Sequence, residues 1–167
     1  MDRYNTFLQR FVAGLIDGCI FIPISFLGSF FEGSDKFSVA VWSLIYLFAW
    51  SFYYIFLHGR DGQTLGKKVM SIKVYDVDEK SVIGYRRAFY RESVPIILEL
   101  IYIVVIFIEP EYSEMIVLSI LSGSATFIWF ALELVSMFTN SKRRAVHDFM
   151  GESVVIDLKI QHQEALF

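Results

Sequence analysis

Cysteine is almost absent from this chain of 167 residues, which contains only Cys19. One cysteine cannot form a disulfide within the chain, and it cannot supply the several thiolates of a cysteine-based metal site. Histidine is nearly as scarce, because the chain has only His58, His147 and His162, and these do not have metal-ligand spacing. We therefore expect neither a metal centre nor any other cofactor.

Motifs for nucleotide binding, nucleic-acid binding and hydrolysis are also missing. The stretch "HGRDGQTLGKK", residues 58–68, is rich in glycine and lysine but lacks the Gly-x-x-x-x-Gly-Lys-Ser/Thr order of a phosphate-binding loop. No basic groove interleaved with aromatic residues indicates a nucleic-acid partner. His147 and Asp148 are adjacent, so on a helix they point about 100° apart, and no serine or cysteine accompanies them as a nucleophile. The sequence predicts a protein that is not an enzyme and does not bind nucleic acid.

Apolar residues, by contrast, are in excess. Hydrophobic residues make up 55% of the chain and aromatic residues 17%, with a mean hydropathy of +0.50, which is more than one soluble core of this size hides. Windows of about 19 residues, compared with a hydrocarbon core of roughly 30 Å, indicate four membrane-spanning segments. We place them at residues 11–31, 38–57, 93–108 and 115–138. A soluble helical bundle is disfavoured because amphipathic helices that would cover these segments are missing, and a cleaved signal peptide does not fit the long first segment.

Basic residues fall on one side of these segments. Of the 15 lysines and arginines, only Lys36 lies in a predicted outer loop, where the other charged residues are acidic: Glu32, Asp35, Glu109, Glu111 and Glu114. Because short basic flanks stay in the cytoplasm, we predict an all-α membrane protein with four transmembrane helices and both termini cytoplasmic. The whole chain, residues 1–167, is then one membrane domain. Its formal net charge of −3 conceals a basic inner face that favours anionic lipids.

The predicted cytoplasmic loop, residues 58–92, is the one polar segment long enough to have structure of its own. Within it, "VMSIKVYD", residues 69–76, has the alternation of a strand, and the turn formers "VDEK" follow. "SVIGYRRAFYRES" then regains helical spacing. The predicted cytoplasmic tail, residues 139–167, contains a second candidate strand, "ESVVIDLKI" at 152–160, which could pair with residues 69–76.

Three arginines in the helical part of this loop, Arg86, Arg87 and Arg91, alternate with aromatic residues. In an amphipathic helix at the membrane surface, the basic side chains would point to lipid phosphates and the aromatic rings to the interface. The cluster is either a surface for anionic lipid or a protein partner, or an anchor that only sets the topology.

An acidic residue lies inside the first apolar segment, "RFVAGLIDGCIFIPISFLGSFF", residues 10–31. Arg10 and Asp17 share a helix face, but they lie about 10 Å apart along the axis and cannot form a salt bridge. Asp148 is the candidate that would fold back between them. Two carboxylates beside one arginine would interact strongly, so that one holds a proton or the pair shares a cation. The alternative is that Asp17 bonds across helices and specifies packing.

Two glycines and two further acids belong to the same apolar segments. Gly14 and Gly18 form a Gly-x-x-x-Gly pair beside Asp17 and predict close approach of another helix, either of the same chain or of a second copy. Glu99 and Glu133 lie in the third and fourth segments at a depth similar to that of Asp17. The three carboxylates could line one water-filled vestibule that serves as an ion or proton pathway. Alternatively, each finds a polar partner and stays protonated.

Three stretches of the chain also resemble those of a known family: "RFVAGLID", "GQTLGKKVMSIKVYD" and "KRRAVHDFMGESVVI". Together they are similar to the RDD family of small bacterial membrane proteins. That family takes its name from an arginine and an aspartate of the first membrane helix and a second aspartate downstream, which match Arg10, Asp17 and Asp148. One departure is "MGESVVI", where Ser153 is the nearest substitute for the threonine that the family more often has.

This resemblance implies a multi-pass protein of the bacterial inner membrane. Some members of the family are described as cation/proton antiporters, which implies exchange of small monovalent cations for protons at Arg10, Asp17 and Asp148, with Glu99 and Glu133 as further candidates. Four short helices make a thin wall for a conducting path, so we expect a homodimer. The competing hypothesis is a non-transporting accessory or scaffold protein, whose polar cluster is structural and whose basic cytoplasmic face binds lipid or a partner.

Overall fold

Four long helices make up most of the chain. The computed structural model describes residues 2–31, 35–108 and 112–164, without the side chains of residues 108, 112–119 and 122. The long helices are α1 (Phe7–Gly28), which a short 3-10 helix, η1 (Ser29–Phe31), extends, α2 (Lys36–Asp61), α4 (Gly84–Ile108) and α5 (Tyr112–Thr139). Each of the four predicted segments falls within one of these helices. The predicted outer-loop acids Glu32, Glu109 and Glu111 lie outside the described residues.

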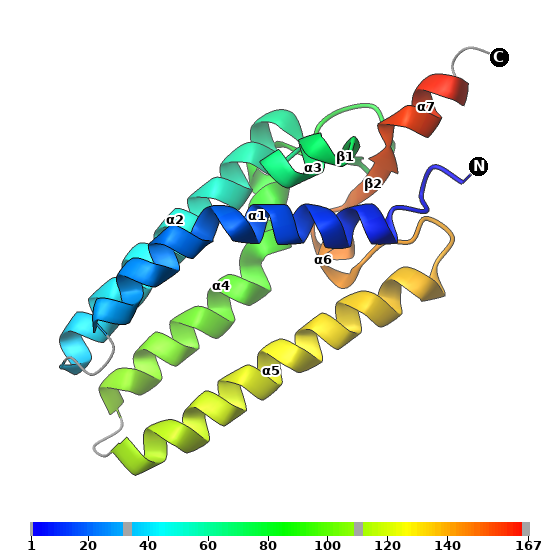
Figure 1. Ribbon diagram of the computed structural model, residues 1–167. Helices are drawn as coiled ribbons and strands as arrows, with labels where there is room; N and C mark the ends of the chain where they lie inside the picture. The colour runs from blue at the N-terminus through cyan, green and yellow to red at the C-terminus, as the bar shows by residue number, and fades with distance from the viewer. Residues whose placement is uncertain (1, 32–34, 109–111, 165–167) are drawn as a thin grey trace.

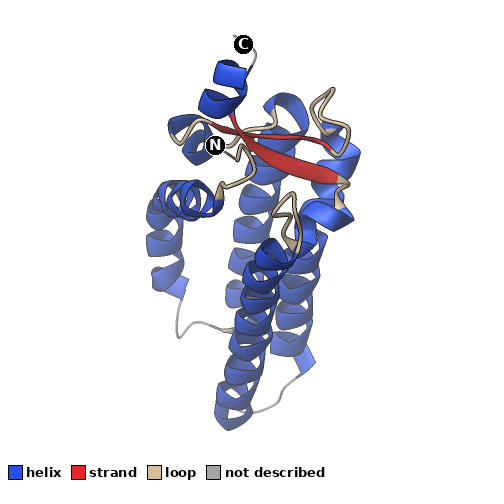
Figure 2. Cartoon of the chain, turned by 90° about the vertical axis from the view of Figure 1, so that its right-hand side faces the viewer, coloured by secondary structure: helices blue, strands red, loops and turns tan. Residues whose placement is uncertain are grey.

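The short elements gather at one end of the long helices. They are α3 (Leu65–Val69), β1 (Ile72–Asp76), α6 (Val146–Met150), β2 (Ser153–Asp157) and α7 (Leu158–Glu164). Figure 2 shows β1 and β2 across this end, and the first and last described residues lie beside them (Figure 1). The two strands pair antiparallel, with Val74 opposite Val155. The predicted strands and their pairing are therefore confirmed for residues 72–76 and 153–157, whereas residue 69 ends α3 and residues 158–160 begin α7.

A small apolar core attaches this sheet to the helices. Ile72, Val74 and Val155 are completely buried and pack with Ala13 of α1 and Ile83, which precedes α4. The alternation seen in the loop sequence places Ile72 and Val74 on the same face of β1, so burying that face fixes the register of the strand.

The outer faces of the long helices are apolar. Large side chains that are more than half exposed occur on all four: Leu15, Phe26, Phe48, Ile101 and Phe127 are examples. The segments Phe7–Phe31 and Lys36–Asp61 are long and apolar enough to cross a membrane, yet only 17% and 11% of their apolar windows are buried. A core helix of a soluble protein would be mostly buried, so this exposure is typical of lipid-facing helices. Gly123–Thr139 of α5 forms a shorter apolar helix.

The basic stretch of the loop differs from its prediction. It forms the first turns of α4 instead of a separate surface helix. Arg86 is exposed and Arg87 pairs with Glu152 at 2.8 Å, but Arg91 is only 3% exposed. The prediction that Arg91 points to lipid phosphates is wrong, because this side chain turns inward to a buried carboxylate.

Gly14 and Gly18 do not hold another helix of the same chain. A Cβ built on either glycine meets no atom within 4 Å among the residues that the structure describes. The close approach to α1 occurs at Ala13, where a Cβ on Gly66 of α3 would lie 2.1 Å from the Ala13 carbonyl oxygen. Within one chain the packing prediction is therefore wrong, because the short helix α3, and not a long helix, packs closely on α1. Packing against a second copy stays a prediction.

Candidate functional site

The carboxylate of Asp148 lies between two arginines. Its Oδ2 accepts a hydrogen bond from Arg10 Nη1 at 2.5 Å, and its Oδ1 accepts one from Arg91 Nη1. Asp148 is fully buried. We call these three residues the Arg-Asp-Arg triad. Since α1, α4 and α6 supply one member each, the triad ties two long helices to the segment that follows α5.

Neighbouring groups hold the triad in place. The backbone N–H of Ala145 donates to Asp148 Oδ2 at 3.0 Å. Ala145 is the N-cap residue of α6, so this bond lies at the start of the helix. The side chain of Arg144 donates to the Asp148 carbonyl oxygen at 3.0 Å. Ser153 supplies a hydroxyl oxygen 2.5 Å from Arg91 Nη1. The serine therefore makes a buried hydroxyl contact with the triad.

The electrostatic setting keeps Asp148 ionised. Burial acts to raise the pKa of this carboxyl, but the positive charges of Arg10 and Arg91 outweigh burial and hold the pKa well below its usual range. A carboxylate in this setting is a fixed negative charge and not an exchangeable proton carrier.

Asp17 lies apart from the triad. Its Oδ1 accepts hydrogen bonds from the Tyr53 hydroxyl and the Gly66 backbone N–H, both at 2.7 Å. No hydrogen bond or ion pair joins it to Arg10 or Asp148 in the part of the chain that the structure describes. The prediction of two carboxylates beside one arginine is wrong, because Asp148 bridges Arg10 to Arg91 and not to Asp17. The observed contacts are those of the packing alternative, since they hold α1 to α2 and α3.

A cavity next to the triad collects several ionisable side chains. Its volume is about 380 Å³, and residues of α1, α2, α4 and α5 line it. We call it the polar cavity. Aromatic residues such as Trp50 and Trp129 form part of the wall, and the ionisable residues are Arg10, Tyr54, His58, Lys67, Arg91, Glu92, Glu133 and His147.

Two histidine–carboxylate pairs lie on this wall. Nδ1 of His58 in α2 is 3.3 Å from Oε1 of Glu92 in α4. Nδ1 of His147 in α6 is 2.6 Å from Oε2 of Glu133 in α5, and the His147 backbone N–H donates to Glu133 Oε1 at 3.1 Å. His58, Glu92 and Glu133 are all less than 9% exposed. Each pair therefore places a titratable couple at the contact between two different elements.

Lys67 of α3 lines the same cavity. Burial, with repulsion from Arg91 as a smaller cause, lowers the pKa of Lys67 to about 8. Its ammonium group can therefore release a proton close to neutral pH. Of the charged residues that line the polar cavity or belong to the triad, the three cations Arg10, Lys67 and Arg91 are balanced by the three carboxylates Glu92, Glu133 and Asp148, when both histidines are neutral.

The sequence matches the family model described as RDD family over residues 4–152, which is most of the chain. It belongs to the RDD family. The match begins before Arg10 and ends after Asp148, so it includes all three of the residues Arg10, Asp17 and Asp148. No curated protein and no solved structure gives a significant match.

Three residues of the polar cavity in this RDD protein do not stand out in its sequence. His58 and His147 lack metal-ligand spacing, and Glu92 precedes the expected start of the third apolar segment at residue 93. A signal for Glu92 is nevertheless present. Because α4 begins at Gly84, Glu92 lies two helical turns before Glu99 and on the same helix face.

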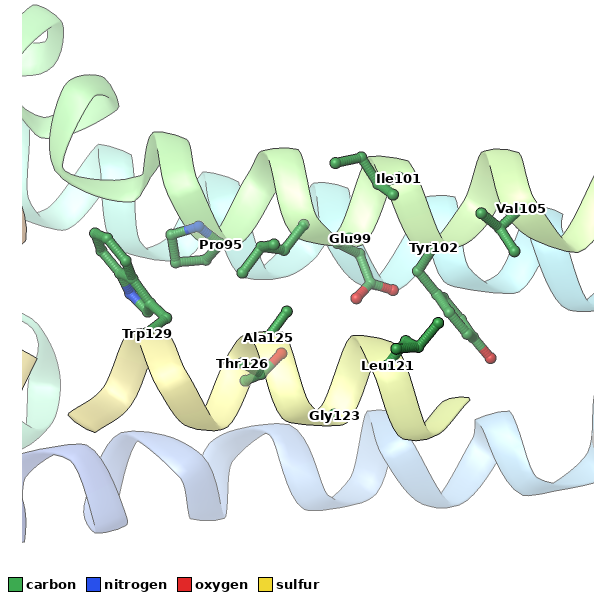
Figure 3. A pocket seen from close by; sticks show the side chains of 11 residues that line it. Pro95, Glu99, Ile101, Tyr102, Val105, Leu121, Gly123, Ala125, Thr126 and Trp129 are labelled. Atoms are coloured by element: carbon green, nitrogen blue, oxygen red, sulfur yellow. The ribbon is translucent and has the colours of Figure 1, made fainter. Parts of the chain in front are cut away.

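Glu99 itself does not line the polar cavity. It lines a second cavity, of about 830 Å³, between α4 and α5 (Figure 3). Asp17 lines neither of these two cavities, so of the three predicted acids only Glu133 lies at the polar cavity. The described cavities therefore do not bring Asp17, Glu99 and Glu133 together in one vestibule.

Proposed function

We propose that this RDD protein is a multi-pass membrane protein that exchanges a small monovalent cation for protons at the polar cavity. The observation that carries the proposal is the gathering of two histidine–carboxylate pairs and Lys67 around one cavity among four helices with apolar outer faces. Ionisable groups are costly inside a membrane and typically mark ion or proton pathways.

Charge balance links cation entry to proton exit. The cavity lies among apolar helices, where an uncompensated charge is expensive. Its cations and carboxylates, together with Asp148, already balance. A cation that enters adds one positive charge, and loss of one proton from Lys67 removes it. Binding of the cation and binding of the proton therefore oppose each other.

The residues take different roles in this exchange. Glu92 and Glu133 supply carboxylate oxygens, the ligands that hard cations prefer. Lys67 carries the exchangeable proton, and His58 and His147 position the two carboxylates. Arg10, with Asp148 and Arg91, forms a fixed element that shapes one wall of the cavity. The proposed activity is transport and not catalysis.

The proposed membrane topology has four spans, with both termini and the sheet in the cytoplasm of a bacterial cell. Two of the long helices are long and apolar enough to cross a bilayer, and the positive-inside bias of the sequence favours this orientation. The polar cavity then lies near the cytoplasmic side. Exposed Arg86, beside the exposed rings of Tyr85 and Phe89, is placed to contact anionic lipid.

A homo-oligomer belongs to the same proposal. Gly14 and Gly18 expose a flat strip of α1, on which a second copy could approach closely. Cys19 is exposed beside them, and it is the only cysteine of the chain. Crosslinking of two chains at Cys19 in membranes would support this interface, and monomers only would speak against it.

The second candidate function is that of a non-transporting scaffold. The observation that favours it is the bonding of both Asp148 carboxylate oxygens in the Arg-Asp-Arg triad, which holds α6 against α1 and α4. In that case the polar cavity would be a by-product of packing, and the basic face would recruit lipid or a partner.

Proton flux in sealed proteoliposomes separates the two candidates. We would record the internal pH with a dye while adding sodium, lithium, potassium or no cation, and compare wild type with Glu133→Gln and Glu92→Gln. Glu152→Gln is the matched control, because Glu152 lies on the surface, where it pairs with Arg87. Exchange requires cation-dependent flux that both buried substitutions abolish and the control retains. Absence of flux from folded wild type favours the scaffold.

A further inference from the structure

The second cavity has a chemistry of its own. It lies between α4 and α5, and apolar side chains such as Leu98, Val105 and Leu121 form most of its wall. Four residues depart from this character: Glu99, Tyr102, Thr126 and Trp129. In Figure 3 the Glu99 carboxylate and the Tyr102 ring extend from α4 toward α5, and Trp129 lies near one end of the cavity. The cavity therefore combines one acid, two aromatic rings and an apolar wall.

No hydrogen bond or ion pair from the described residues satisfies the Glu99 carboxylate. Such a group in an apolar cavity either stays neutral or takes a positive partner from outside the chain. The arginines of the triad do not serve as that partner, since neither Arg10 nor Arg91 lines this cavity. Glu99 also borders a smaller space with Tyr46 and Trp50 on α2, so more aromatic rings surround its other side.

We infer that the cavity between α4 and α5 binds a lipophilic organic cation, an ammonium or phosphonium ion that carries aromatic or aliphatic groups. Glu99 supplies the opposite charge, Trp129 and Tyr102 supply ring faces that attract a cation, and the apolar wall takes the hydrophobic groups. The cavity volume of about 830 Å³ is within the range of sites for drug-sized ligands.

A small inorganic cation does not fit this site equally well. Hard cations take several oxygen ligands, whereas Glu99 is the only carboxylate among the residues that line this cavity. A lipid acyl chain fits the apolar wall but gives no counter-charge to Glu99. The inference goes beyond the proposed exchange function, since it uses a different cavity, a different acid and a different class of ligand.

Equilibrium dialysis of the purified full-length protein in detergent, with tetraphenylphosphonium as the probe, tests the inference. We expect saturable binding to wild type and a rise of about tenfold or more in Kd for Glu99→Gln, because the cation loses its counter-charge. Glu99→Asp should retain part of the affinity, and Trp129→Ala should weaken binding more than Trp129→Phe. Glu164→Gln, a change at an exposed glutamate of α7, should bind like wild type.

Uncharged triphenylphosphine provides the decisive comparison. We expect it to bind weakly, and equally to wild type and Glu99→Gln. Equal binding of the cation to wild type and Glu99→Gln, or equal affinity of wild type for the charged and uncharged probes, would overturn the inference and leave an apolar groove for lipid. Glu99→Gln removes a charge from an apolar helix, so its folding is expected to persist and is checked by elution volume. Quenching of tryptophan fluorescence by the cation should be larger in wild type than in Trp129→Phe, and equal quenching in both would also contradict the site.

Discussion

Replacement of Asp148 by asparagine should strongly destabilise the folded protein. The substitution removes the negative charge shared by Arg10 and Arg91 and leaves two nearly buried guanidinium groups without compensation. Removal of one partner from a buried ion pair costs roughly 3 to 5 kcal/mol. For a chain of this size, each kcal/mol corresponds to about 2 to 4 °C in Tm, so the Tm should fall by roughly 6 to 20 °C.

Thermal unfolding of the purified protein in detergent, followed by tryptophan fluorescence, measures this change. Asp61→Asn is the matched control, since Asp61 pairs with Arg60 and Lys68 at the partly exposed end of α2, at 2.8 and 3.0 Å. Surface pairs contribute little to stability, so the control should unfold close to wild type. Equal Tm values for Asp148→Asn and Asp61→Asn would refute the reasoning.

The same carboxylate should also make stability depend on acid. In the folded state the pKa of Asp148 lies well below the ordinary value of 3.8 for this carboxyl, so its contribution to stability is fully present above pH 3.8. As the pH falls below 3.8 toward the folded-state pKa, the unfolded chain takes up a proton first and the contribution is lost. The Tm difference between wild type and Asp148→Asn should therefore shrink in this acid range and stay constant at higher pH.

Three further predictions concern α1 and α3. Asp17→Asn should fold with nearly the stability of wild type, because an amide oxygen can accept the bonds from Tyr53 and Gly66; Asp17→Val should lose about 2 kcal/mol of unfolding free energy by denaturant titration. Gly66→Ala should lose about 1 to 3 kcal/mol in the same titration, because its Cβ would lie 2.1 Å from the Ala13 carbonyl oxygen, and wild-type stability would contradict this close contact. Amine acetylation followed by mass spectrometry should show Lys67 becoming half-reactive near pH 8, and a midpoint at the ordinary lysine value of 10.5 would contradict its buried setting.

The sheet and the apolar helices are the features that local sequence patterns predict best. Alternation in residues 69–76 identifies β1, because a strand with one buried face repeats every two residues. The apolar runs identify the long helices for a similar reason, since their outer faces need no polar partner. Hydropathy predicts the first residue of a helix less well. The helix α4 begins at Gly84, before its apolar run, so hydropathy alone assigns Arg91 and Glu92 to a polar loop, although their side chains point inward.

Contacts between distant segments account for what sequence patterns miss. Arg91 and Asp148 are 57 residues apart and meet because α6 folds back against α4. Asp17 meets Gly66, 49 residues away, because α3 packs on α1. Neither partner follows from helical or strand periodicity. The position of Arg10 at the start of α1, together with the family resemblance, predicts that Arg10 lies near Asp148. Neither of these features indicates that a second arginine, Arg91, also binds Asp148.

Proton release from the purified protein on addition of a monovalent cation tests the exchange at the polar cavity most directly. In weakly buffered detergent solution near pH 8, a pH dye reports protons displaced by sodium, lithium or potassium, with choline chloride at equal ionic strength as the control. The account predicts saturable release by at least one of the small cations from wild type, and no release from folded Glu92→Gln or Glu133→Gln. A folded wild type that releases no protons with any cation, or that releases as many with choline, would contradict cation/proton exchange at this cavity.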